Sequence, residues 1–446
     1  MDASEGSLKL IAEQIVRKEV SPSRANYLFT MMAFSRNPTS GSVRAVLPIL
    51  EEKDVPRQAL LGISALIHNS WNGGQPQQTP EIRDAVKAIV KYMDRNIKHA
   101  DRVVVALKAL QNIGAIEEAM EKVIQLATDA SQKSGVRVAA IEALRPQAAQ
   151  PKVTDKCMEI FQNTQESSEV RIAAYKVAIE SRQRQHVQRI VQTIRREENK
   201  QVGAFVSTHL KNLRDSSSPR HEALQQMLQD EKIPIERFPQ DMRKYSRNFE
   251  LSQYIGQLGL GGVLDADLIY DKSFAPRSVR MNLTVPIAEG ELNMFEFGFR
   301  QVGLEDEIRK LVGPHLKGRN APEIMTEVLA EIVDLFDQES NSNEVPNGRF
   351  ARNVQKRKNM FHKLNSKDDV EAAFYLNLDG KTIAYFDIAD LTHPENDMSQ
   401  AIRSVIQEIR ATDNVDRAYS LMFMKNEFEV PSKDGKTPVA VNGTII

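Results

Sequence analysis

The chain repeats itself in the stretch Ser134-Gly135-Val136-Arg137-Val138-Ala139-Ala140-Ile141-Glu142-Ala143-Leu144, which returns 34 residues later as Ser168-Glu169-Val170-Arg171-Ile172-Ala173-Ala174-Tyr175-Lys176-Val177-Ala178. A looser copy lies upstream at Leu107-Lys108-Ala109-Leu110, and another begins at Val202-Gly203-Ala204-Phe205. A period of this length, built of helix-forming residues with small Ala at closely packed positions, indicates paired helices stacked into a solenoid. A solenoid is normally a frame or a binding surface, so any chemistry is expected elsewhere.

The first half of the chain is predicted to be helical almost throughout. Apolar residues recur at intervals of three and four from Ser7 to about Leu228. Proline after a polar residue marks helix starts at Ser21-Pro22 and Thr79-Pro80. Arg137 and Arg171 occupy equivalent repeat positions, where we expect structural guanidinium groups that bond carbonyls of a neighbouring turn; a ligand site is the alternative. Residues 1–230 are therefore predicted to form a helical superhelix.

The second half changes to an alternating pattern, which predicts strands in residues 231–446. In one candidate strand the side chains of Val279, Met281, Leu283, Val285 and Ile287 share a face, with Arg280, Asn282 and Thr284 on the other. One face must therefore meet something apolar. The next strand places Phe295, Phe297 and Phe299 on a single face, as ordinary core or as a contact with a bound apolar ligand.

Three further features complete the predicted sheet region. Asp265 and Asp267 share a strand face and are expected on a solvated surface. Asp379-Gly380 suits a two-residue type I′ turn, which would pair Leu376 with Ile383 and Phe374 with Tyr385. A third sheet element is expected at residues 418–430, and helices at 322–336 and 397–410. The mixture predicts an α+β fold.

Composition and motifs exclude several functions. Lys+Arg 59 against Asp+Glu 60 gives a net charge of -1, so we expect no nucleic-acid partner. No apolar run is long enough for a transmembrane segment. We find no catalytic motif and no metal-ligand spacing, so no catalytic residue, metal or cofactor is predicted. The start has no signal peptide, the end stops in strand-like residues, and Cys157 is the single cysteine, so we expect an internal fragment of a longer chain.

Several ordered stretches together resemble the large lipid transfer proteins, the family of vitellogenin, apolipoprotein B and the microsomal triglyceride transfer protein. They are Arg243-Lys244-Tyr245-Ser246-Arg247-Asn248-Phe249-Glu250, Leu264-Asp265-Ala266-Asp267-Leu268-Ile269-Tyr270, Lys272-Ser273-Phe274-Ala275-Pro276-Arg277-Ser278, Asn282-Leu283-Thr284-Val285 and Phe295-Glu296-Phe297-Gly298-Phe299-Arg300-Gln301-Val302-Gly303-Leu304-Glu305. Within the family the chain looks most like an arthropod apolipophorin, a lipophorin precursor. The resemblance covers essentially the whole chain.

The resemblance implies a helical superhelix followed by open amphipathic antiparallel β-sheets that line a lipid cavity. It implies a secreted, circulating lipoprotein that binds phospholipid and diacylglycerol and reaches a lipoprotein receptor through its parent protein, with the remainder of the same precursor as a partner. On this hypothesis Met281, Leu283, Val285 and Ile287 face lipid or the adjacent core. Phe295, Phe297 and Phe299 form a second group of candidates.

Two kinds of processing site follow if the parent is secreted. Asn282-Leu283-Thr284 and Asn442-Gly443-Thr444 are N-glycosylation sequons, which makes Asn282 and Asn442 candidates for glycans. Apolipophorins are cut by a furin-like protease, and Arg352 in Arg349-Phe350-Ala351-Arg352 is a candidate site of the cut. A basic solvated loop that is never cut is the alternative.

Three other functions remain open on the sequence. A helical-repeat scaffold for protein partners would explain the first half but does not need strands with continuous apolar faces. A yolk storage role, as in vitellogenin, would use the same architecture. An enzyme with an unrecognised site is the third.

Overall fold

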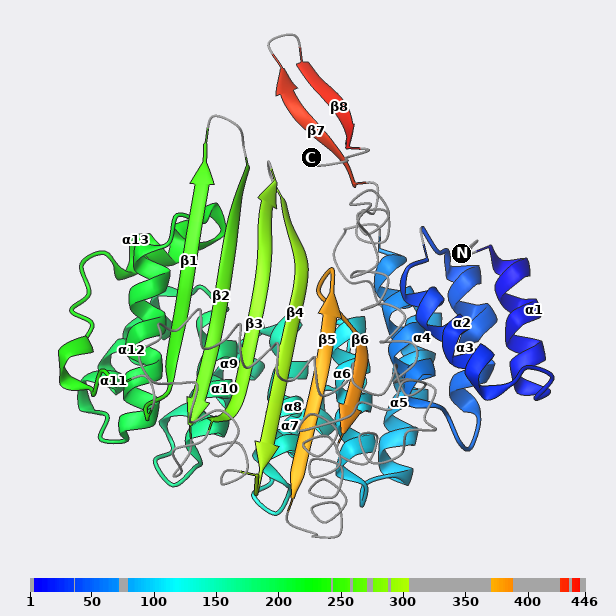
Figure 1. Ribbon diagram of the computed structural model, residues 1–446, viewed down its shortest axis with the longest axis horizontal. Coiled ribbons are helices and arrows are strands. Elements are labelled where there is room, and N and C mark those ends of the chain that lie inside the picture. Colours follow the sequence, from blue (N-terminus) through cyan, green and yellow to red (C-terminus); the bar gives the residue numbers. More distant parts are fainter. Residues whose placement is uncertain are drawn as a thin grey trace, which may run out of the picture.

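A curved double layer of helices covers one face of a six-stranded sheet (Figure 1). The computed structural model describes residues 4–35, 37–71, 79–241, 244–256, 260–270, 276–287, 290–304, 370–387, 426–432 and 435–441. The described helices end at Leu228 and the first strand begins at Arg247. The predicted helices at 322–336 and 397–410 and the start of the third sheet element, 418–425, lie outside the described residues.

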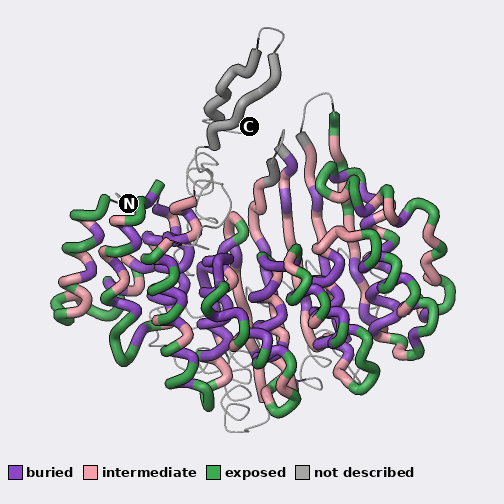
Figure 2. The backbone as a smooth tube through the Cα atoms, turned by 180° about the vertical axis from the view of Figure 1, so that it is seen from behind, coloured by how far each residue is buried: buried purple, intermediate pink, exposed green. Residues whose placement is uncertain are grey.

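The helices alternate between an inner layer beside the sheet and an outer layer. The inner layer contains α2 (Pro22–Ala33), α4 (Arg57–Asn69), α6 (Ala100–Ile113), α8 (Ser134–Ala143), α10 (Ser168–Ile179) and α12 (Lys200–Asp215). The outer layer contains α1 (Glu5–Val16), α3 (Ser40–Glu51), α5 (Pro80–Arg95), α7 (Met120–Thr128), α9 (Pro151–Gln162), α11 (Arg184–Arg196) and α13 (Glu222–Leu228). Each inner helix packs on the next inner helix, as expected of a solenoid. Most of the buried apolar residues belong to the helices and form one cluster. Figure 2 shows the buried positions, in purple, along the helices of both layers.

The repeat seen in the sequence is a repeat of inner helices. The four copies fall in α6, α8, α10 and α12, which are successive neighbours. The predicted starts at Pro22 and Pro80 are also confirmed, because Ser21 and Thr79 cap those helices through their side-chain oxygens.

The two equivalent arginines are structural, as predicted. Arg137 Nε donates to the carbonyl of Ala127 at 3.1 Å, and Arg171 Nε donates to that of Phe161 at 2.8 Å. Each guanidinium also forms a two-pronged ion pair, Arg137 with Glu166 and Arg171 with Glu197. In both cases the arginine links its inner helix to the end of the preceding outer helix. It also links its inner helix to the loop before the next inner helix, where Glu166 and Glu197 lie.

The larger sheet is antiparallel, with its strands in chain order. Its strands are β1 (Arg247–Ile255), β2 (Leu260–Tyr270), β3 (Pro276–Ile287), β4 (Gly290–Val302), β5 (Glu371–Leu378) and β6 (Lys381–Asp387). β7 (Asn426–Ser432) and β8 (Gly435–Val441) form a separate two-stranded sheet. Short 3-10 turns at Arg145–Gln147, Pro219–His221 and Ile235–Arg237 connect the helices to each other and to β1.

The hairpin of β5 and β6 has the predicted turn but not the predicted register. Asp379 and Gly380 both have positive φ, 51° and 72°, as a type I′ turn requires. The strands pair Leu376 with Ala384 and Phe374 with Phe386, one residue away from the prediction. The cause is a bulge on β6 at Ile383, whose carbonyl accepts a hydrogen bond from Gln58 of α4 at 3.0 Å. A helix side chain therefore takes a backbone group that a regular ladder would use.

Candidate functional site: an open sheet with one apolar face

The register of the sheet divides its side chains between two faces, because directly opposed residues point to the same side. Met281 lies opposite Ala266 and Phe297, and Leu283 lies opposite Leu264 and Phe295. We call this side the apolar face. Its described members are Phe249, Leu251, Leu264, Ala266, Leu268, Val279, Met281, Leu283, Val285, Phe295, Phe297, Phe299, Phe374, Leu376 and Phe386. Over β1 to β4 it is turned away from the helices (Figure 1). At the β6 side Phe386 packs in a cluster with Ala33 of α2 and Ala65 of α4.

The apolar face is only partly covered. Phe297 is buried at 8% exposure, whereas Met281, Leu283, Val285, Phe295 and Phe299 are half-buried. Leu251 on the edge strand is 73% exposed. The ring centres of Phe297 and Phe374 lie 4.2 Å apart, with the rings edge to face. Strands β4 to β6 thus carry an aromatic cluster, which lies beside the mainly aliphatic side chains of β2 and β3. A broad hydrocarbon surface of this kind is available to an apolar ligand.

The opposite face is polar, and it is the face that packs on the helices. Arg280 of β3 lies at its centre and binds three carboxylates, those of Asp265 and Asp267 on β2 and Glu296 on β4. Its Nε lies 2.7 Å from Asp267 and its Nη1 2.9 Å from Glu296. Lys176 of α10 also binds Asp267. These charges are satisfied by one another inside the interface.

The expectation that Asp265 and Asp267 lie on a solvated surface is wrong for Asp267 and incomplete for Asp265. Asp267 is 2% exposed. Asn248 of β1 donates to both carboxylates, at 2.6 Å for Asp265 and 2.9 Å for Asp267. The helical layer and β3 supply cations that offset the cost of burying these groups. Alternation in the sequence separated the two faces correctly but did not indicate that the polar one would be covered by protein.

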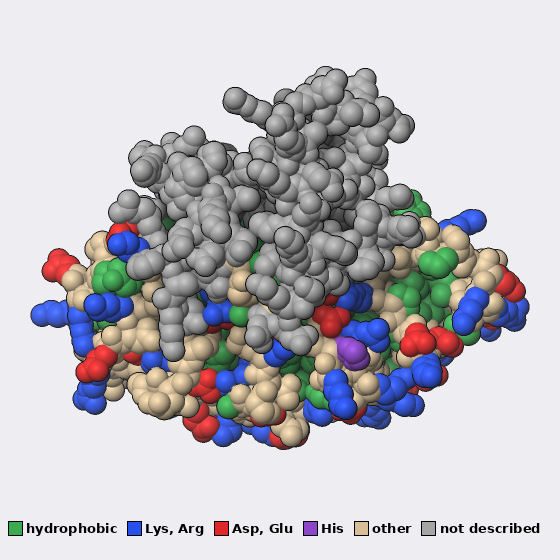
Figure 3. Space-filling model, turned by 60° about the horizontal axis from the view of Figure 1, so that its bottom comes forward, with side chains coloured by type: hydrophobic (Ala, Val, Ile, Leu, Met, Phe, Trp, Pro, Cys, Tyr) green, Lys and Arg blue, Asp and Glu red, His purple; other side chains and the backbone are tan. Residues whose placement is uncertain are grey.

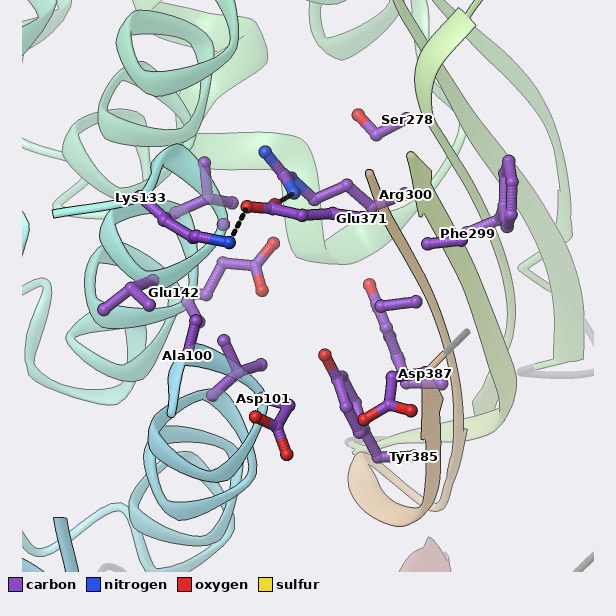
Figure 4. Close-up of a pocket in the computed structure, with 18 of the residues that line it drawn as sticks. Ala100, Asp101, Lys133, Glu142, Ser278, Phe299, Arg300, Glu371, Tyr385 and Asp387 are labelled. Carbon is purple, nitrogen blue, oxygen red and sulfur yellow. Dashed lines mark hydrogen bonds and ion pairs between the residues drawn. The ribbon is translucent and has the colours of Figure 1, made fainter. Parts of the chain in front are cut away.

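A second arginine joins the sheet to two inner helices. Arg300 of β4 donates to Glu169 of α10 at 2.9 Å and 3.1 Å, and to the hydroxyl of Ser134 at the start of α8 at 2.6 Å. It also binds Glu371 of β5 at 2.7 Å, beside Lys133 (Figure 4). A Cβ on Gly135 would lie 2.8 Å from the Arg300 guanidinium. Gly135 and Glu169 occupy equivalent positions of the repeat. Gly135 leaves room for the Arg300 guanidinium, and Glu169 binds it.

A charged cavity of roughly 440 Å³ lies between the inner helices and the middle of the sheet. Lys108, Glu142 and Lys176 line it at successive equivalent positions of the repeat. Lys108 Nζ binds Glu142 at 2.7 Å and lies 3.9 Å from the ring centre of Tyr375. Arg57 at the start of α4 also lines the cavity and bridges Asp101 and Asp387. Phe299 points away from this cavity, toward the apolar face (Figure 4).

Three carboxylates of this interface have lowered pKa values. Burial by itself would raise the pKa of Glu296, but the charge of Arg280, with that of Arg145 and nearby lysines, lowers it to about 2. Burial would also raise the pKa of Glu142, but Lys108 and Arg145 together lower it below its usual value. Arg280 and Lys176 hold the pKa of Asp267 far below its usual range against strong desolvation. The interface is therefore a network of ion pairs rather than a set of proton donors.

The predicted site residues fall into three groups. Met281, Leu283, Val285 and the three phenylalanines lie on the apolar face, whereas for Ile287 the structure describes only the backbone of β3. Asn282 lies on the polar face, where its Oδ1 accepts a hydrogen bond from Asn293 at 2.6 Å. Asn442 and Arg352 lie outside the described residues. Lipid contact, glycosylation and cleavage stay predictions.

Sequence reasoning missed the residues that hold the sheet. Arg280 was predicted only to lie on the polar face of a strand, and Arg300 was named only within a stretch that resembles the family. No pattern at a single position distinguishes a buried arginine from a solvated one. A signal did exist for Lys108, Glu142 and Lys176, because alternating charges recur at the spacing of the repeat. Equivalent positions on successive inner helices lie side by side, so this spacing predicts a charged row across them.

The described residues show no alternative chemical centre. Among them no three His, Cys, Asp or Glu side chains are grouped so that they could hold a metal ion. None of the helices in the described ranges combines the length and the apolar character that crossing a membrane requires. Basic and acidic side chains are interspersed over the face shown in Figure 3 rather than collected into a patch of one sign.

These features define a class of protein in which a two-layer helical superhelix holds an open sheet by its polar face and leaves the apolar face outward. Comparisons with known families agree. Residues 3–211 match the vitellogenin TPR domain, and residues 244–435 match the open β-sheet of vitellinogen. Together these matches take in most of the chain. The chain therefore belongs to the vitellogenin-type family of large lipid transfer proteins.

Individual relatives support this assignment. Apolipophorins of Locusta migratoria are 28% identical over 82% of this chain and 10% of their own length. Vitellogenin of Penaeus merguiensis is 28% identical over 69% of this chain and 12% of its own. A solved structure of lipovitellin shares the fold, with a TM-score of 0.61 at 18% identity over 92% of this chain and 38% of that one. The chain thus spans about a tenth of the curated relatives it matches.

Proposed function

We propose that this chain binds lipid on the apolar face as part of a secreted lipoprotein similar to the apolipophorins. The observation that carries the proposal is the orientation of the sheet, whose polar face is joined to the helices by buried ion pairs while its apolar face is left half-buried. Apolar burial contributes roughly 25 cal/mol per Å². A layer of acyl chains would stabilise this face without any catalytic residue.

The relatives favour lipid over the alternatives. A protein scaffold would use the outer helices and would gain nothing from an outward hydrocarbon sheet. The lipovitellin structure is described by its lipid–protein interactions, and it shares this fold. We infer that phospholipid and diacylglycerol are the ligands, that the chain acts outside the cell, and that receptor contacts and further lipid surface belong to other parts of its precursor.

The test compares two lysine substitutions on neighbouring residues of β3. Leu283→Lys places a charge on the apolar face, where lipid would have to desolvate it, so bound lipid should fall several-fold. Asn282→Lys adds the same charge on the opposite face, between Asp265 and Glu296, and should leave lipid content near that of the wild type. Extracted lipid per mole of protein is measured by mass spectrometry, with circular dichroism as the check of folding. Folded Leu283→Lys protein with a normal lipid content would refute the proposal.

A further inference from the structure

Helix side chains bond backbone groups on both outer edges of the sheet. On β6, Asn112 of α6 binds both the N–H and the carbonyl of Thr382, at 2.8 and 2.9 Å. On β1, Gln201 and Thr208 of α12 accept from the N–H groups of Ser246 and Asn248. Asn212 donates to the carbonyl of Asn248 at 3.1 Å. Side chains thus replace the missing neighbouring strand.

This capping stops halfway along β1. α12 ends at Asp215, and the outward backbone groups of Asn248 are the last that its side chains reach. Outward groups recur every second residue along a strand, and β1 pairs with β2 without a bulge, so the next ones belong to Glu250, Ser252 and Tyr254. No group in the described ranges bonds to these three backbone positions. Uncovered edges of this kind are templates for another strand.

Side chains at the same place also lack partners. Glu250 is 4% exposed at its side chain, and its Oε2 lies 3.9 Å from Nδ1 of His221. Its Oε1, however, has no hydrogen-bond partner among the described residues. It lies directly opposite Asp265 on β2, so two carboxylates are adjacent. The hydroxyl of Ser218, which is 2% exposed, is likewise unsatisfied. On the other face Leu251 and Ile255 are 73% and 46% exposed. Within the described part of the chain, one buried carboxylate oxygen and one buried hydroxyl therefore lack partners on one face of this edge, and two apolar side chains lack cover on the other.

We propose that residues 250–255 dock one further β-strand, contributed by a part of the same polypeptide outside residues 1–446. Charge complementarity places a Lys or Arg of that strand opposite Glu250, and alternation places its apolar side chains beside Leu251 and Ile255. α11, α12 and α13 flank this edge (Figure 1), so a second copy of the chain would bring its own helices into occupied space, whereas a single strand needs only about 5 Å. The matched relatives are about ten times longer than the stretch they share with this chain, which makes an intramolecular strand available at high effective concentration.

Hydrogen exchange resolved to single amides tests this proposal. It is measured on the intact product of the gene and on residues 1–446 alone. Leu251 and Gln253 are the internal reference, since their N–H groups face β2. Ser252 and Tyr254 should be protected in the intact protein and should exchange at least about tenfold faster in residues 1–446, as expected for loss of a backbone hydrogen bond. Fast exchange in the intact protein overturns the proposal, and equal protection in both overturns the assignment of the strand to a region outside this chain.

A matched pair of variants confirms the direction of pairing. Ser252→Pro removes the outward N–H of residue 252, and an edge strand tolerates proline at such a position. The docked strand then loses one of its hydrogen bonds, so protection of the next outward N–H, that of Tyr254, should be abolished. Ser252→Ala keeps the N–H of residue 252 and removes the hydroxyl, which accepts from the Ser217 N–H and from the Ser216 hydroxyl, so protection should remain. Protection at Tyr254 that survives Ser252→Pro would contradict the proposed ladder. Lipid does not replace a backbone partner, so this result is independent of lipid binding.

Discussion

At the scale of single residues, ion pairs between oppositely charged side chains hold the polar face of the sheet against the helices. Arg280 is 12% exposed at its side chain and binds carboxylates on both neighbouring strands. Arg300 binds one carboxylate from the helices and one from β5. Removing one partner of such a network leaves a buried charge, which typically costs about 3–5 kcal/mol. These residues fix which face of the sheet remains outward.

Stability should fall in two stages as the pH is lowered. His209 of α12 accepts or donates one bond with the Tyr175 hydroxyl at 2.8 Å, and burial lowers its pKa to about 4. An unfolded histidine titrates near 6.5, so the unfolded state binds more protons between about pH 6.5 and 4, and stability falls as the pH drops through that window. Glu296, with a folded pKa of about 2, loses its contribution at lower pH, from about 4.3 downward.

Urea unfolding at a series of pH values measures both stages. His209→Gln keeps a side chain that can bond Tyr175 but does not titrate. It should reduce the slope of unfolding free energy between pH 6.5 and 4 by up to about 1.4 kcal/mol per pH unit. The lower stage, assigned to the carboxylates, should remain. An unchanged slope in His209→Gln would show that another group carries the first stage.

Residue patterns in the sequence predicted some of these roles and not others. The repeat showed that Arg137 and Arg171 are equivalent. A repeated arginine in packed helices is predicted to have a structural role, and the contacts of both residues confirm it. Asp267 gave no such signal, because its partner Lys176 is 91 residues away. A charged residue on a strand looks the same in sequence whether water or a helix faces it.

At the scale of elements, the β5–β6 hairpin depends on two residues with positive φ. Gly380→Ala should destabilise the protein by about 1–2 kcal/mol, since φ of 72° disfavours any Cβ although space for it is available. Gly262→Ala in β2 is the matched control, because its Cβ would also meet nothing within 4 Å and its φ is not positive. The control should be neutral or slightly stabilising. Equal effects of the two substitutions in urea unfolding would show that the turn is not under this constraint.

The elements also show where sequence patterns stop being informative. Asp379-Gly380 predicted the turn type correctly, because it is a local property. The register beyond the turn was wrong by one residue, since Gln58 and Asn112 bond the β6 backbone from helices more than 260 residues earlier in the chain. The sequence of a strand does not predict a bulge that depends on a partner far away in the chain.

At the scale of the whole molecule, the superhelix and the sheet have complementary surfaces. Inner helices offer charged and amide side chains, and the sheet turns its polar face to them, so the hydrocarbon face is left for another occupant. Repeat period and alternation predicted the two halves of the fold. The family resemblance implied that the apolar face lines a lipid cavity, and lipid contact stays a prediction. The direction in which the sheet faces follows only from contacts between the two halves.

The most direct measurement of the central claim is photolabelling with a phospholipid that carries a diazirine near the end of its acyl chain. Labelled residues are identified by mass spectrometry of the lipid-loaded protein. The account predicts labels on Met281, Leu283 and Phe295 of the apolar face and none on Lys108 or Tyr375 beside the charged cavity. Labels that collect in the cavity or on the outer helices, with the apolar face unmarked, would contradict it.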